Sequence, residues 1–578
     1  MQNYNNYLSD KWISDNSLTI DKNWKNVLKQ IEKKSKKIIS IDGDYSVDWQ
    51  NIQLTVRKSI VKNKKIIFLN FYECMLSYQD LNKFFTNNLL DGDSLFGKIS
   101  KQNINKLLER KKTLDFIKKF KKIFKNKDVY DYIIITGTGI NSIGINNYFD
   151  TKFYINLNKT NSLIKNNWSN IGKTQTVSPN FFYYFIFPIM EKYQKKILKK
   201  TDYYVENRKN RDFKIISTAN LFKILSKISK EPLKLDPIYE PGVWGGKWLT
   251  KKRNLNIENC AIGMELIGQE QNILIKFKNN VIEIPFPLIM SFMGSNILGK
   301  NNSAKYKNYF PLRVAYDDTF NNEDENLSIQ VHPNKSYIKS KFNESLGQAE
   351  MYYIADQSKK SRVFLGFKNN ISGKEFKKEI KYSAKTGKKI NYEKFINSIN
   401  ANKEDLFLIP PGTVHAAGSG NFVLEISNTP YRYTFKIYDY CRLNIDGKKR
   451  QLSLKHAFNV LKYKRNSTWV NKNLKPQPQL LIAKKNYSEY LLSNHKSFTF
   501  DLFKIYFKNY YDDKTFKSMH VLNLVKGKMI FLINDKKNIK IKLFLSETLL
   551  IPSKFGSYKI ESSNNKEFQI IKVVLKEC

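Results

Sequence analysis

Two histidines and two oxygen-bearing side chains have the types and spacing that a metal site requires. The segment Leu327–Pro333 reads Leu-Ser-Ile-Gln-Val-His-Pro. On a β-strand successive side chains alternate between faces, so Ser328, Gln330 and His332 share one face and the apolar residues share the other. Gln330 and His332 can therefore offer an oxygen and a nitrogen to one ion.

Glu350 and His415 complete this predicted site. Glu350 lies in Ala-Glu-Met-Tyr-Tyr-Ile, and His415 follows Pro410-Pro411-Gly412-Thr413-Val414. Zinc accepts imidazole and carboxylate ligands, and a site without cysteine ligands is typical of a catalytic ion with an open position. We expect one Zn2+ per chain. The alternative is structural: core histidines, a turn-forming Gln330 and an edge-strand Glu350.

The pattern of apolar, polar and turn-forming residues changes along the chain, and with it the elements that must position these residues. We predict an α/β domain over 1–230, a catalytic β domain over 231–465 and a second, metal-free β domain over 466–578. In the first, apolar runs at 65–71 and 132–136 read as buried strands, and apolar residues at spacings of three or four between 107 and 124 predict an amphipathic helix. This alternation favours a parallel sheet covered by helices.

The other two regions have short strand-like runs separated by Gly and Pro, which is typical of all-β sandwich domains. Residues 370–404 are polar and Lys-rich, and we expect a helical insertion there. In the tail, strands are expected at 498–507, 521–525, 528–533 and 539–544. His456 is expected to be structural, and His495 and His520 lack ligand-like neighbours in the sequence.

The composition is strongly basic. The chain has 578 residues, 99 Lys and Arg against 52 Asp and Glu, and a net charge of +47. Such a charge suits nucleic-acid or acidic-membrane partners. The Lys residues are spread along the whole chain beside many Asn, Ile, Tyr and Phe residues, so compositional bias is favoured over a nucleic-acid surface.

Cysteine and hydropathy patterns predict a cytoplasmic protein without a membrane span. The four cysteines are widely spaced and form no CxxC pair. The longest apolar run, 181–190, is too short to cross a bilayer, and the first residues lack a secretory pattern. The oligomeric state is left open.

Several motifs together resemble the class I mannose-6-phosphate isomerases. They are Glu-Pro-Gly-Val-Trp-Gly-Gly at 240–246, Leu-Ser-Ile-Gln-Val-His-Pro at 327–333, Ala-Glu-Met-Tyr-Tyr-Ile at 349–354 and Pro-Gly-Thr-Val-His-Ala-Ala-Gly-Ser-Gly at 411–420. The resemblance implies a cupin-type (jelly-roll) sandwich. It also implies a zinc-dependent interconversion of mannose 6-phosphate and fructose 6-phosphate through a cis-enediol.

The resemblance also implies roles for individual residues. Gln330, His332, Glu350 and His415 match the family's metal ligands; Glu425 and Arg432 match an active-site acid and an active-site arginine; Ser328, Lys436 and Trp244 would contact the sugar phosphate. For Glu425 and Arg432 the structural alternative is a buried ion pair. For Lys436 it is a solvated surface lysine.

One departure from the family pattern leaves the substrate open. The family carries a Lys two residues before the ligand Glu, and here that position is Gln348. The alternatives are an isomerase for another sugar or sugar phosphate, or a non-catalytic sugar-phosphate sensor whose basic first domain binds nucleic acid.

Residues 36–160 resemble, more faintly, a P-loop kinase of the uridine-kinase type. A working P-loop needs glycines and a Lys-[Ser/Thr] pair, and Asp42-Gly43-Asp44-Tyr45-Ser46 has neither. We therefore expect a degenerate α/β domain without phosphoryl transfer.

Overall fold

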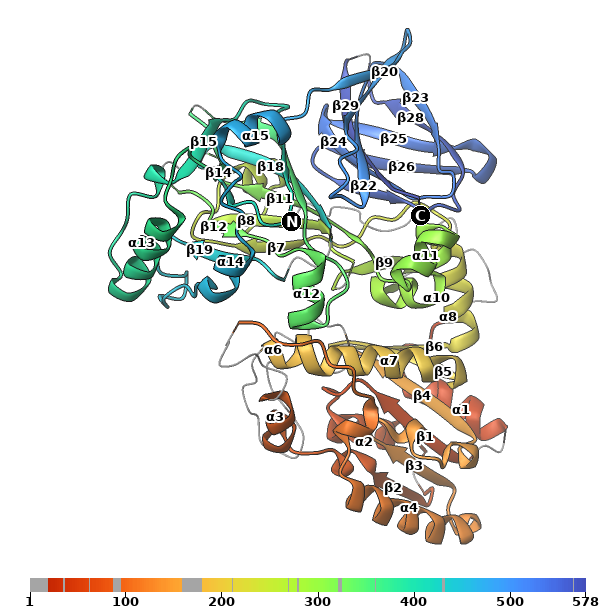
Figure 1. Ribbon diagram of the computed structural model, residues 1–578. Helices are drawn as coiled ribbons and strands as arrows, with labels where there is room; N and C mark the ends of the chain where they lie inside the picture. The colour runs from red at the N-terminus through yellow and green to blue at the C-terminus, as the bar shows by residue number, and fades with distance from the viewer. Residues whose placement is uncertain are drawn as a thin grey trace. The chain divides into compact units, whose positions relative to one another are not determined.

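The computed structural model describes most of the chain, in two compact units. The described residues are 19–34, 37–61, 63–86, 95–157, 179–209, 212–268, 270–277, 280–320, 325–358, 360–428, 432–564 and 566–577. Leu8–Lys227 and Leu274–Pro285 form one unit, called here the α/β unit, and Ile228–Ile273 and Phe286–Cys578 form the other, called the β unit (Figure 1).

The α/β unit is built on a six-stranded sheet in the order β2-β3-β1-β4-β5-β6. Its strands are β1 Ile38–Gly43, β2 Ile66–Asn70, β3 Tyr132–Thr136, β4 Thr151–Asn156, β5 Tyr203–Lys209 and β6 Asp212–Ser217. The first five pair in parallel and β6 pairs antiparallel with β5. Strands predicted at 65–71 and 132–136 are confirmed, because β-branched runs such as Tyr132–Thr136 are buried along their whole length.

Helices accompany this sheet. The main ones are α1 Trp24–Lys33, α2 Trp49–Ser59, α3 Tyr78–Thr86, α4 Arg110–Lys125, α7 Phe187–Ile197 and α8 Thr218–Ile228. The predicted amphipathic helix is α4, which buries Phe116 and Phe120. Leu107 instead ends a short 3-10 helix, η3 (Ile104–Leu107), so the helix begins later than its apolar spacing suggested.

Asp42 organises the turns that follow β1 and β3. Its Oδ1 accepts hydrogen bonds from the backbone N–H groups of Gly43 at 2.7 Å and Gly139 at 2.9 Å. Its Oδ2 accepts from the backbone N–H of Asn141 at 2.9 Å and from the Tyr193 hydroxyl. Burial raises the pKa of Asp42 to about 6 despite these four donors.

The first sandwich of the β unit has two antiparallel sheets, as the β-rich prediction required. One has the order β16-β13-β18-β11-β8-β7 and the other β15-β14-β17-β12-β19. The strands of the first sheet are β7 Ile238–Pro241, β8 Cys260–Leu266, β11 Leu312–Asp318, β13 Glu350–Gln357, β16 Leu406–Ile409 and β18 Asn421–Asn428. Those of the second are β12 Ile329–Val331, β14 Arg362–Phe367, β15 Ile396–Asn400, β17 His415–Ala417 and β19 Phe435–Tyr438.

The stretch 370–404 is only partly helical, so the predicted helical insertion was too long. Gly373–Thr386 forms α13, whose N-cap Ser372 accepts a hydrogen bond from the Glu375 N–H. Ile396–Asn400 forms β15 at the edge of its sheet, paired with β14. An edge strand is half-exposed, so its polar Ile-Asn-Ser-Ile-Asn sequence resembles that of a surface helix.

The second sandwich begins with β20, after the segment Asn466–Leu474. That segment stays with the first sandwich, because the Leu408 N–H donates to the Leu474 carbonyl at 2.9 Å. The second sandwich pairs a sheet of order β20-β21-β22-β29-β24-β27 with one of order β23-β28-β25-β26. Its strands are β20 Gln479–Ala483, β21 Tyr487–Ser493, β22 Phe500–Phe507, β23 Tyr510–Lys514, β24 His520–Lys526, β25 Met529–Asn534, β26 Ile539–Phe544, β27 Thr548–Ile551, β28 Ser557–Ser562 and β29 Phe568–Leu575. The four tail strands predicted from sequence are confirmed.

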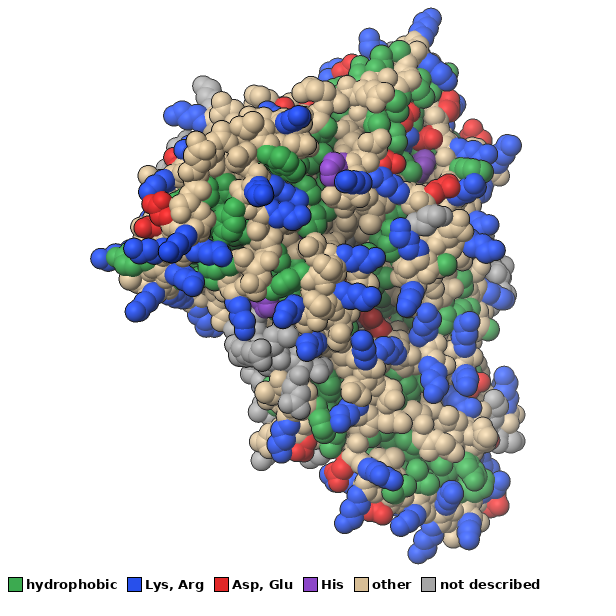
Figure 2. Space-filling view, viewed as in Figure 1, with side chains coloured by type: hydrophobic (Ala, Val, Ile, Leu, Met, Phe, Trp, Pro, Cys, Tyr) green, Lys and Arg blue, Asp and Glu red, His purple; other side chains and the backbone are tan. Residues whose placement is uncertain are grey.

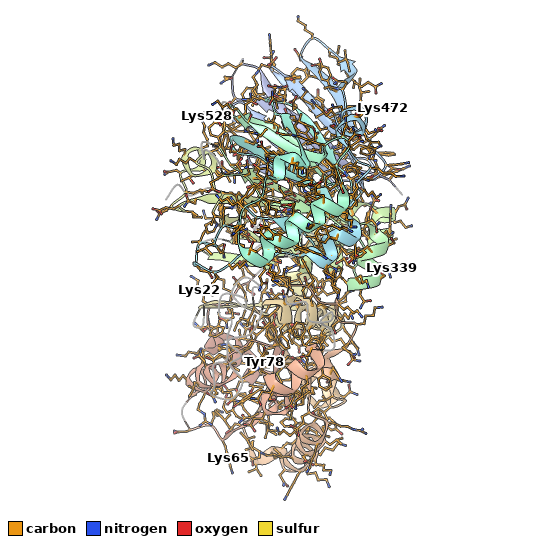
Figure 3. The ribbon with its side chains drawn as sticks, turned by 60° about the vertical axis from the view of Figure 1, so that its left-hand side comes forward. Lys22, Lys65, Tyr78, Lys339, Lys472 and Lys528 are labelled. Carbon is orange, nitrogen blue, oxygen red and sulfur yellow. The ribbon has the colours of Figure 1, made fainter. Side chains whose placement is uncertain are left out.

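Basic side chains cover the face of the molecule seen in Figure 2 and are not gathered over one element. Lys22, Lys65, Lys339, Lys472 and Lys528 extend from widely separated parts of the chain (Figure 3). Among the described residues, no helix is long and apolar enough to cross a membrane. The run at 181–190 is instead buried within the α/β unit.

Candidate metal centre

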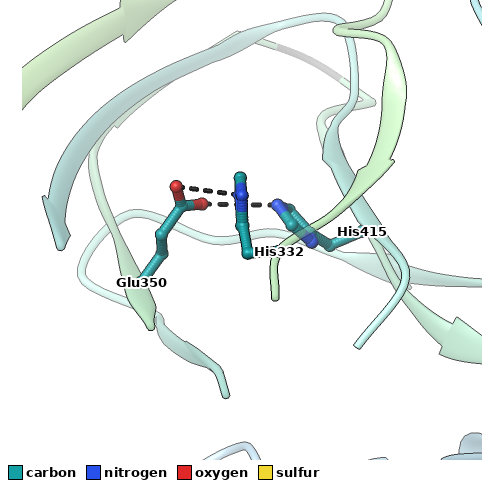
Figure 4. Close-up of side chains that lie close together, drawn as sticks. All are labelled: His332, Glu350 and His415. Atoms are coloured by element: carbon teal, nitrogen blue, oxygen red, sulfur yellow. Dashed lines mark ion pairs between the residues drawn. The ribbon is translucent and has the colours of Figure 1, made fainter. Parts of the chain in front are cut away.

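Three predicted ligands meet between the two sheets of the first sandwich. Glu350 begins β13 of the six-stranded sheet, whereas His332 follows β12 and His415 begins β17 in the five-stranded sheet. The three side chains are almost completely buried, with exposed fractions of 0 to 1%. They point toward one another, as Figure 4 shows. One ligand atom from each lies within 4.8 Å of the others, which is the geometry of a group that could hold a metal ion.

The carboxylate of Glu350 faces both imidazoles. His332 Nε2 lies 2.9 Å from Glu350 Oε1, and His415 Nε2 lies 3.3 Å from Glu350 Oε2. The centroids of the two imidazole rings are 4.9 Å apart. Burial alone would raise the pKa of Glu350, but its contacts with His332 and His415 outweigh burial and hold that pKa well below the usual carboxyl range.

The protonation of the two imidazoles can be read from their other nitrogens. His332 Nδ1 lies 3.4 Å from the Tyr433 carbonyl oxygen, and His415 Nδ1 lies 3.0 Å from the Thr413 carbonyl oxygen. A carbonyl only accepts, so each Nδ1 must donate. Burial lowers the pKa of His332, while the Glu350 carboxylate acts in the opposite direction. With Nδ1 protonated, the neutral form of the ring would present the Nε2 lone pair toward Glu350, which is the form that a metal ion binds.

This arrangement leaves two buried acceptor atoms without a hydrogen-bond donor. His332 Nε2 and Glu350 Oε2 have no hydrogen-bond donor among the described residues. Buried polar atoms without partners cost free energy, and a cation placed between them would satisfy both. The donor set of two imidazole nitrogens and one carboxylate suits zinc.

Gln330 and Ser328 lie beside the three ligands on the face predicted from strand alternation. Gln330 pairs directly with His415 across β12 and β17, and its Nε2 is 3.4 Å from His415 Nε2. Ser328 Oγ donates to Gln330 Oε1 over 3.4 Å. A half-turn of the Gln330 amide would exchange its nitrogen for its oxygen, which is the atom a metal ion requires.

Gln348 contacts the carboxylate ligand directly. Its Nε2 donates to Glu350 Oε1 at 2.6 Å, and the whole side chain is buried. Gln348, which stands where the related pattern has Lys, is therefore a neutral donor that orients Glu350. A lysine there would add a positive charge beside the metal ligands.

Glu425 lies on the same interior face as Glu350. Cross-strand pairing places Glu350 opposite Ser427 and Tyr352 opposite Glu425 on β13 and β18. Arg313 Nη1 donates to Glu425 Oε1 at 2.6 Å, and Glu425 also shares a hydrogen bond with Asp317. Burial raises the pKa of Glu425 well above the carboxyl range and that of Asp317 to about 6. Glu425 therefore carries the shared proton and donates it in a hydrogen bond to Asp317.

The predicted Arg432 is paired elsewhere. Its Nη2 forms an ion pair with Glu270 Oε1. The structural alternative for Glu425 and Arg432 was an ion pair between them. Each instead pairs with another residue, Glu425 with Arg313 and Arg432 with Glu270.

Lys436 and Trp244 lie in a basic cluster beside the predicted metal site. Lys436 pairs with Gln330 across β19 and β12, and burial lowers its pKa to about 8. The guanidinium of Arg450 lies 4.8 Å above the Trp244 ring, and Arg450 and Arg442 both contribute positive potential at Lys436. Asp439 forms ion pairs with both arginines.

Sequence reasoning missed Arg313, Asp317 and Arg450. The first two lie on one face of β11 with Ala315 between them, so two charged residues four positions apart in a largely apolar run were the available signal. Arg450 lies in a polar loop, and nothing in its immediate sequence marked it. The predicted structural role of His456 agrees with its Nδ1 lying 2.7 Å from the Tyr337 hydroxyl.

The fold and the site together define a β-sandwich protein with a candidate metal centre of two His and one Glu. Comparison with known proteins makes the class more specific. A family model described as a domain of unknown function (DUF8485) matches residues 23–230. The chain is 34% identical to the mannose-6-phosphate isomerase ManA of Bacillus subtilis over 152 residues, which are 26% of this chain and 44% of the relative.

Further relatives carry the same name. The chain is 29% identical to the probable mannose-6-phosphate isomerase GmuF of Bacillus subtilis over 40% of this chain and 68% of the relative. It is 27% identical to the mannose-6-phosphate isomerase of Streptococcus mutans, over 40% of this chain and 68% of that relative. A crystal structure of mannose 6-phosphate isomerase from Bacillus subtilis matches with a TM-score of 0.47 and 18% identity, covering 59% of this chain and 99% of that one. The chain spans less than half the length of ManA.

Proposed function

We propose that this protein is a zinc-dependent isomerase that interconverts mannose 6-phosphate and fructose 6-phosphate. The observation that carries the proposal is the convergence of His332, Glu350 and His415, whose ligand atoms lie within 4.8 Å of one another and include buried atoms without a hydrogen-bond partner in the described chain. Gln330 would be the fourth ligand after its amide turns. Bound zinc would supply Lewis-acid polarisation of the substrate oxygens and hold them in place.

The proton transfer is assigned to Glu425 and Asp317. Isomerisation moves a proton between C1 and C2 through a cis-enediol, which requires a base that is ionised near neutral pH. A buried carboxyl pair sharing one proton meets this requirement, since the pKa of Asp317 is raised to about 6. Asp317 draws the proton from Glu425, and the freed Glu425 oxygen takes the substrate proton from one carbon. Glu425 then returns that proton to the other carbon, and Asp317 gives its own proton back to Glu425. Arg313, bonded to Glu425, stabilises the charge left on that oxygen.

Substrate phosphate is assigned to the basic cluster. Lys436 and Arg450 supply positive charge, Trp244 forms an apolar wall under Arg450, and Ser328 adds a hydroxyl beside Gln330. Arginine and lysine are the usual phosphate partners in proteins. Arg432 remains a proposed catalytic residue, and its pairing with Glu270 means that this pair must open before Arg432 reaches substrate.

A second candidate function is isomerisation of a different sugar phosphate. Gln348, a neutral donor to Glu350 where the related pattern has Lys, favours it. The α/β unit is proposed to take no part in phosphoryl transfer, because Asp42 already occupies one backbone donor of the turn after β1 and two of the turn after β3.

The test is a coupled assay for fructose 6-phosphate formed from mannose 6-phosphate by metal-quantified protein, with and without chelator. Chelator-sensitive turnover with about one zinc per chain would support the proposal. One zinc without turnover on mannose 6-phosphate would refute that substrate and lead to a panel of aldose and ketose phosphates. Folded protein with neither zinc nor turnover would refute the isomerase.

A further inference from the structure

A cavity of about 320 Å³ lies in the α/β unit, whereas the candidate metal centre belongs to the β unit. Its wall is formed by η3, by the turns after β3, and by α7 with the short 3-10 helix η8 (Leu198–Lys200). All of its lining residues belong to this one unit. None of them takes part in the proposed isomerase reaction.

Three lysines line the cavity at a spacing of four residues. Lys192, Lys196 and Lys200 share one side of α7 and η8. The backbone positions of consecutive lysines are therefore about 6 Å apart along the helix axis. Lys196 and Lys200 have no carboxylate partner among the residues that the structure describes. Burial and the nearby Lys101 lower the pKa of Lys192, with Glu191 acting in the opposite direction.

Two amide side chains present unsatisfied polar atoms at the same wall. Asn141 is only 6% exposed, and its Nδ2 has no acceptor among the described residues, while its Oδ1 accepts from Ser40 Oγ at 3.0 Å. Asn146 Oδ1 is also buried without a donor in the described part of the chain. Asn141 and Asn146 both line the cavity, and each carries one polar atom without a partner among the described residues, beside the three lysines of the same wall.

The cavity also lies where a parallel sheet places its ligands. Asn141 and Asn146 are in the connection from β3 to β4, which crosses the carboxyl end of β1 because β3 and β4 lie on opposite sides of β1. Such a crossing is the usual ligand position in open α/β sheets. The nearby Asp42 does not oppose an anion strongly, since three backbone N–H groups and the Tyr193 hydroxyl already bond its carboxylate.

We propose that this cavity binds a phosphorylated polyol, with Lys192, Lys196 and Lys200 holding the phosphate and Asn141 and Asn146 bonding hydroxyl groups. A hydroxyl both donates and accepts, so it can satisfy an Asn141 donor and an Asn146 acceptor. The aromatic ring of the wall, Tyr193, is only 3% exposed and its hydroxyl bonds Asp42, so no open ring face is offered to a nucleobase. The site is independent of the isomerase reaction.

The test uses the full chain carrying His415→Ala and Lys436→Gln, so that neither the proposed metal centre nor the lysine assigned to substrate phosphate contributes. Glucitol 6-phosphate, inorganic phosphate, glucitol and AMP are titrated by calorimetry. Glucitol 6-phosphate should bind at one site, at least tenfold more tightly than inorganic phosphate or AMP, and glucitol alone should not bind. Hydrogen exchange should slow at 139–146 and 189–200 when glucitol 6-phosphate is present.

Substitution of the lysines locates the site. Lys196→Gln with Lys200→Gln should weaken glucitol 6-phosphate binding at least tenfold. Lys195→Gln with Lys199→Gln removes the same charge at the same spacing outside the cavity and should change binding less than twofold. Equal loss in both variants, tighter binding of AMP, or no binding of glucitol 6-phosphate at millimolar concentration would overturn the proposal.

Discussion

Gln348 donates a hydrogen bond to Glu350 over 2.6 Å, and this contact joins the residue that departs from the related pattern to a proposed metal ligand. Removing the donor in Gln348→Leu should lower zinc affinity by about 10- to 100-fold, which is the usual effect of losing a partner that orients a ligand. Metal competition with a chromophoric chelator measures this. Gln479→Leu, on an exposed strand position, is the control. Unchanged affinity in Gln348→Leu would mean that Glu350 is oriented without it.

Loss of one imidazole should empty the site. His415→Ala is expected to reduce bound zinc below a tenth of an ion per chain and turnover by at least about 10³-fold, because the ion is assigned several kcal/mol of transition-state stabilisation. Elemental analysis and the coupled assay give the two readouts. His495→Ala, in the second sandwich, should keep both. Full activity in His415→Ala would remove His415 from the ligand set.

The pair Asp317–Glu425 should set the acid limb of the pH profile. Asp317 accepts a proton below its raised pKa of about 6, so kcat/KM should rise with pH through about 6 and then level off. Asp317→Asn should lose this limb and about 10²- to 10⁴-fold in rate. Asp446→Asn, in an exposed loop, should keep it. A limb at an unchanged pH in Asp317→Asn would assign it to another group.

Lys436 should produce a separate effect at alkaline pH. Its pKa is lowered to about 8 by burial, so the ammonium loses its charge as pH rises through about 8 and phosphate binding weakens. KM should therefore rise above pH 8 while kcat changes little, and Lys436→Gln should have a high KM at every pH. Lys448→Gln, fully in solvent, is the control. A kcat change without a KM change would contradict this role.

A buried lysine should dominate the stability of the second sandwich. Lys572 Nζ lies 2.8 Å from Glu489 and 2.7 Å from Asp513, and its side chain is 6% exposed. Lys572→Met would leave both carboxylates without their cation, so we expect a loss of about 3–5 kcal/mol in the free energy of unfolding. Lys526→Met breaks an exposed pair with Glu567 and should cost about 0–1 kcal/mol. Denaturant titration distinguishes the two, and equal losses would contradict the assignment.

Local patterns predicted the elements and the proposed ligands because those signals are local. Alternation along 327–333 placed Gln330 and His332 on one face, and buried β-branched runs marked β3 and the tail strands. The Pro-Gly turn before His415 fixed where that residue could lie. These features depend on a few neighbouring residues, so sequence alone carries them.

The carboxyl pair and its arginine depended on strand register, which the sequence does not reveal. Arg313 reaches Glu425 because β11 pairs with β18, with Ala315 directly opposite Glu425. Glu270 pairs with Arg432 although the two lie in connections far apart in the sequence, which local patterns do not reveal either. The edge strand β15 was missed because half-exposed strands carry the polar residues typical of surface helices.

Asp42 has a consequence for how the α/β unit responds to nucleotides. Backbone N–H groups gathered at a turn are the donors with which nucleotide-binding proteins hold phosphate, and here three of them already hold a carboxylate that belongs to the chain. The protein thus carries its own substitute anion, fixed by covalent connection and present at all times. A phosphate would therefore have to displace a carboxylate that is tethered at these two turns.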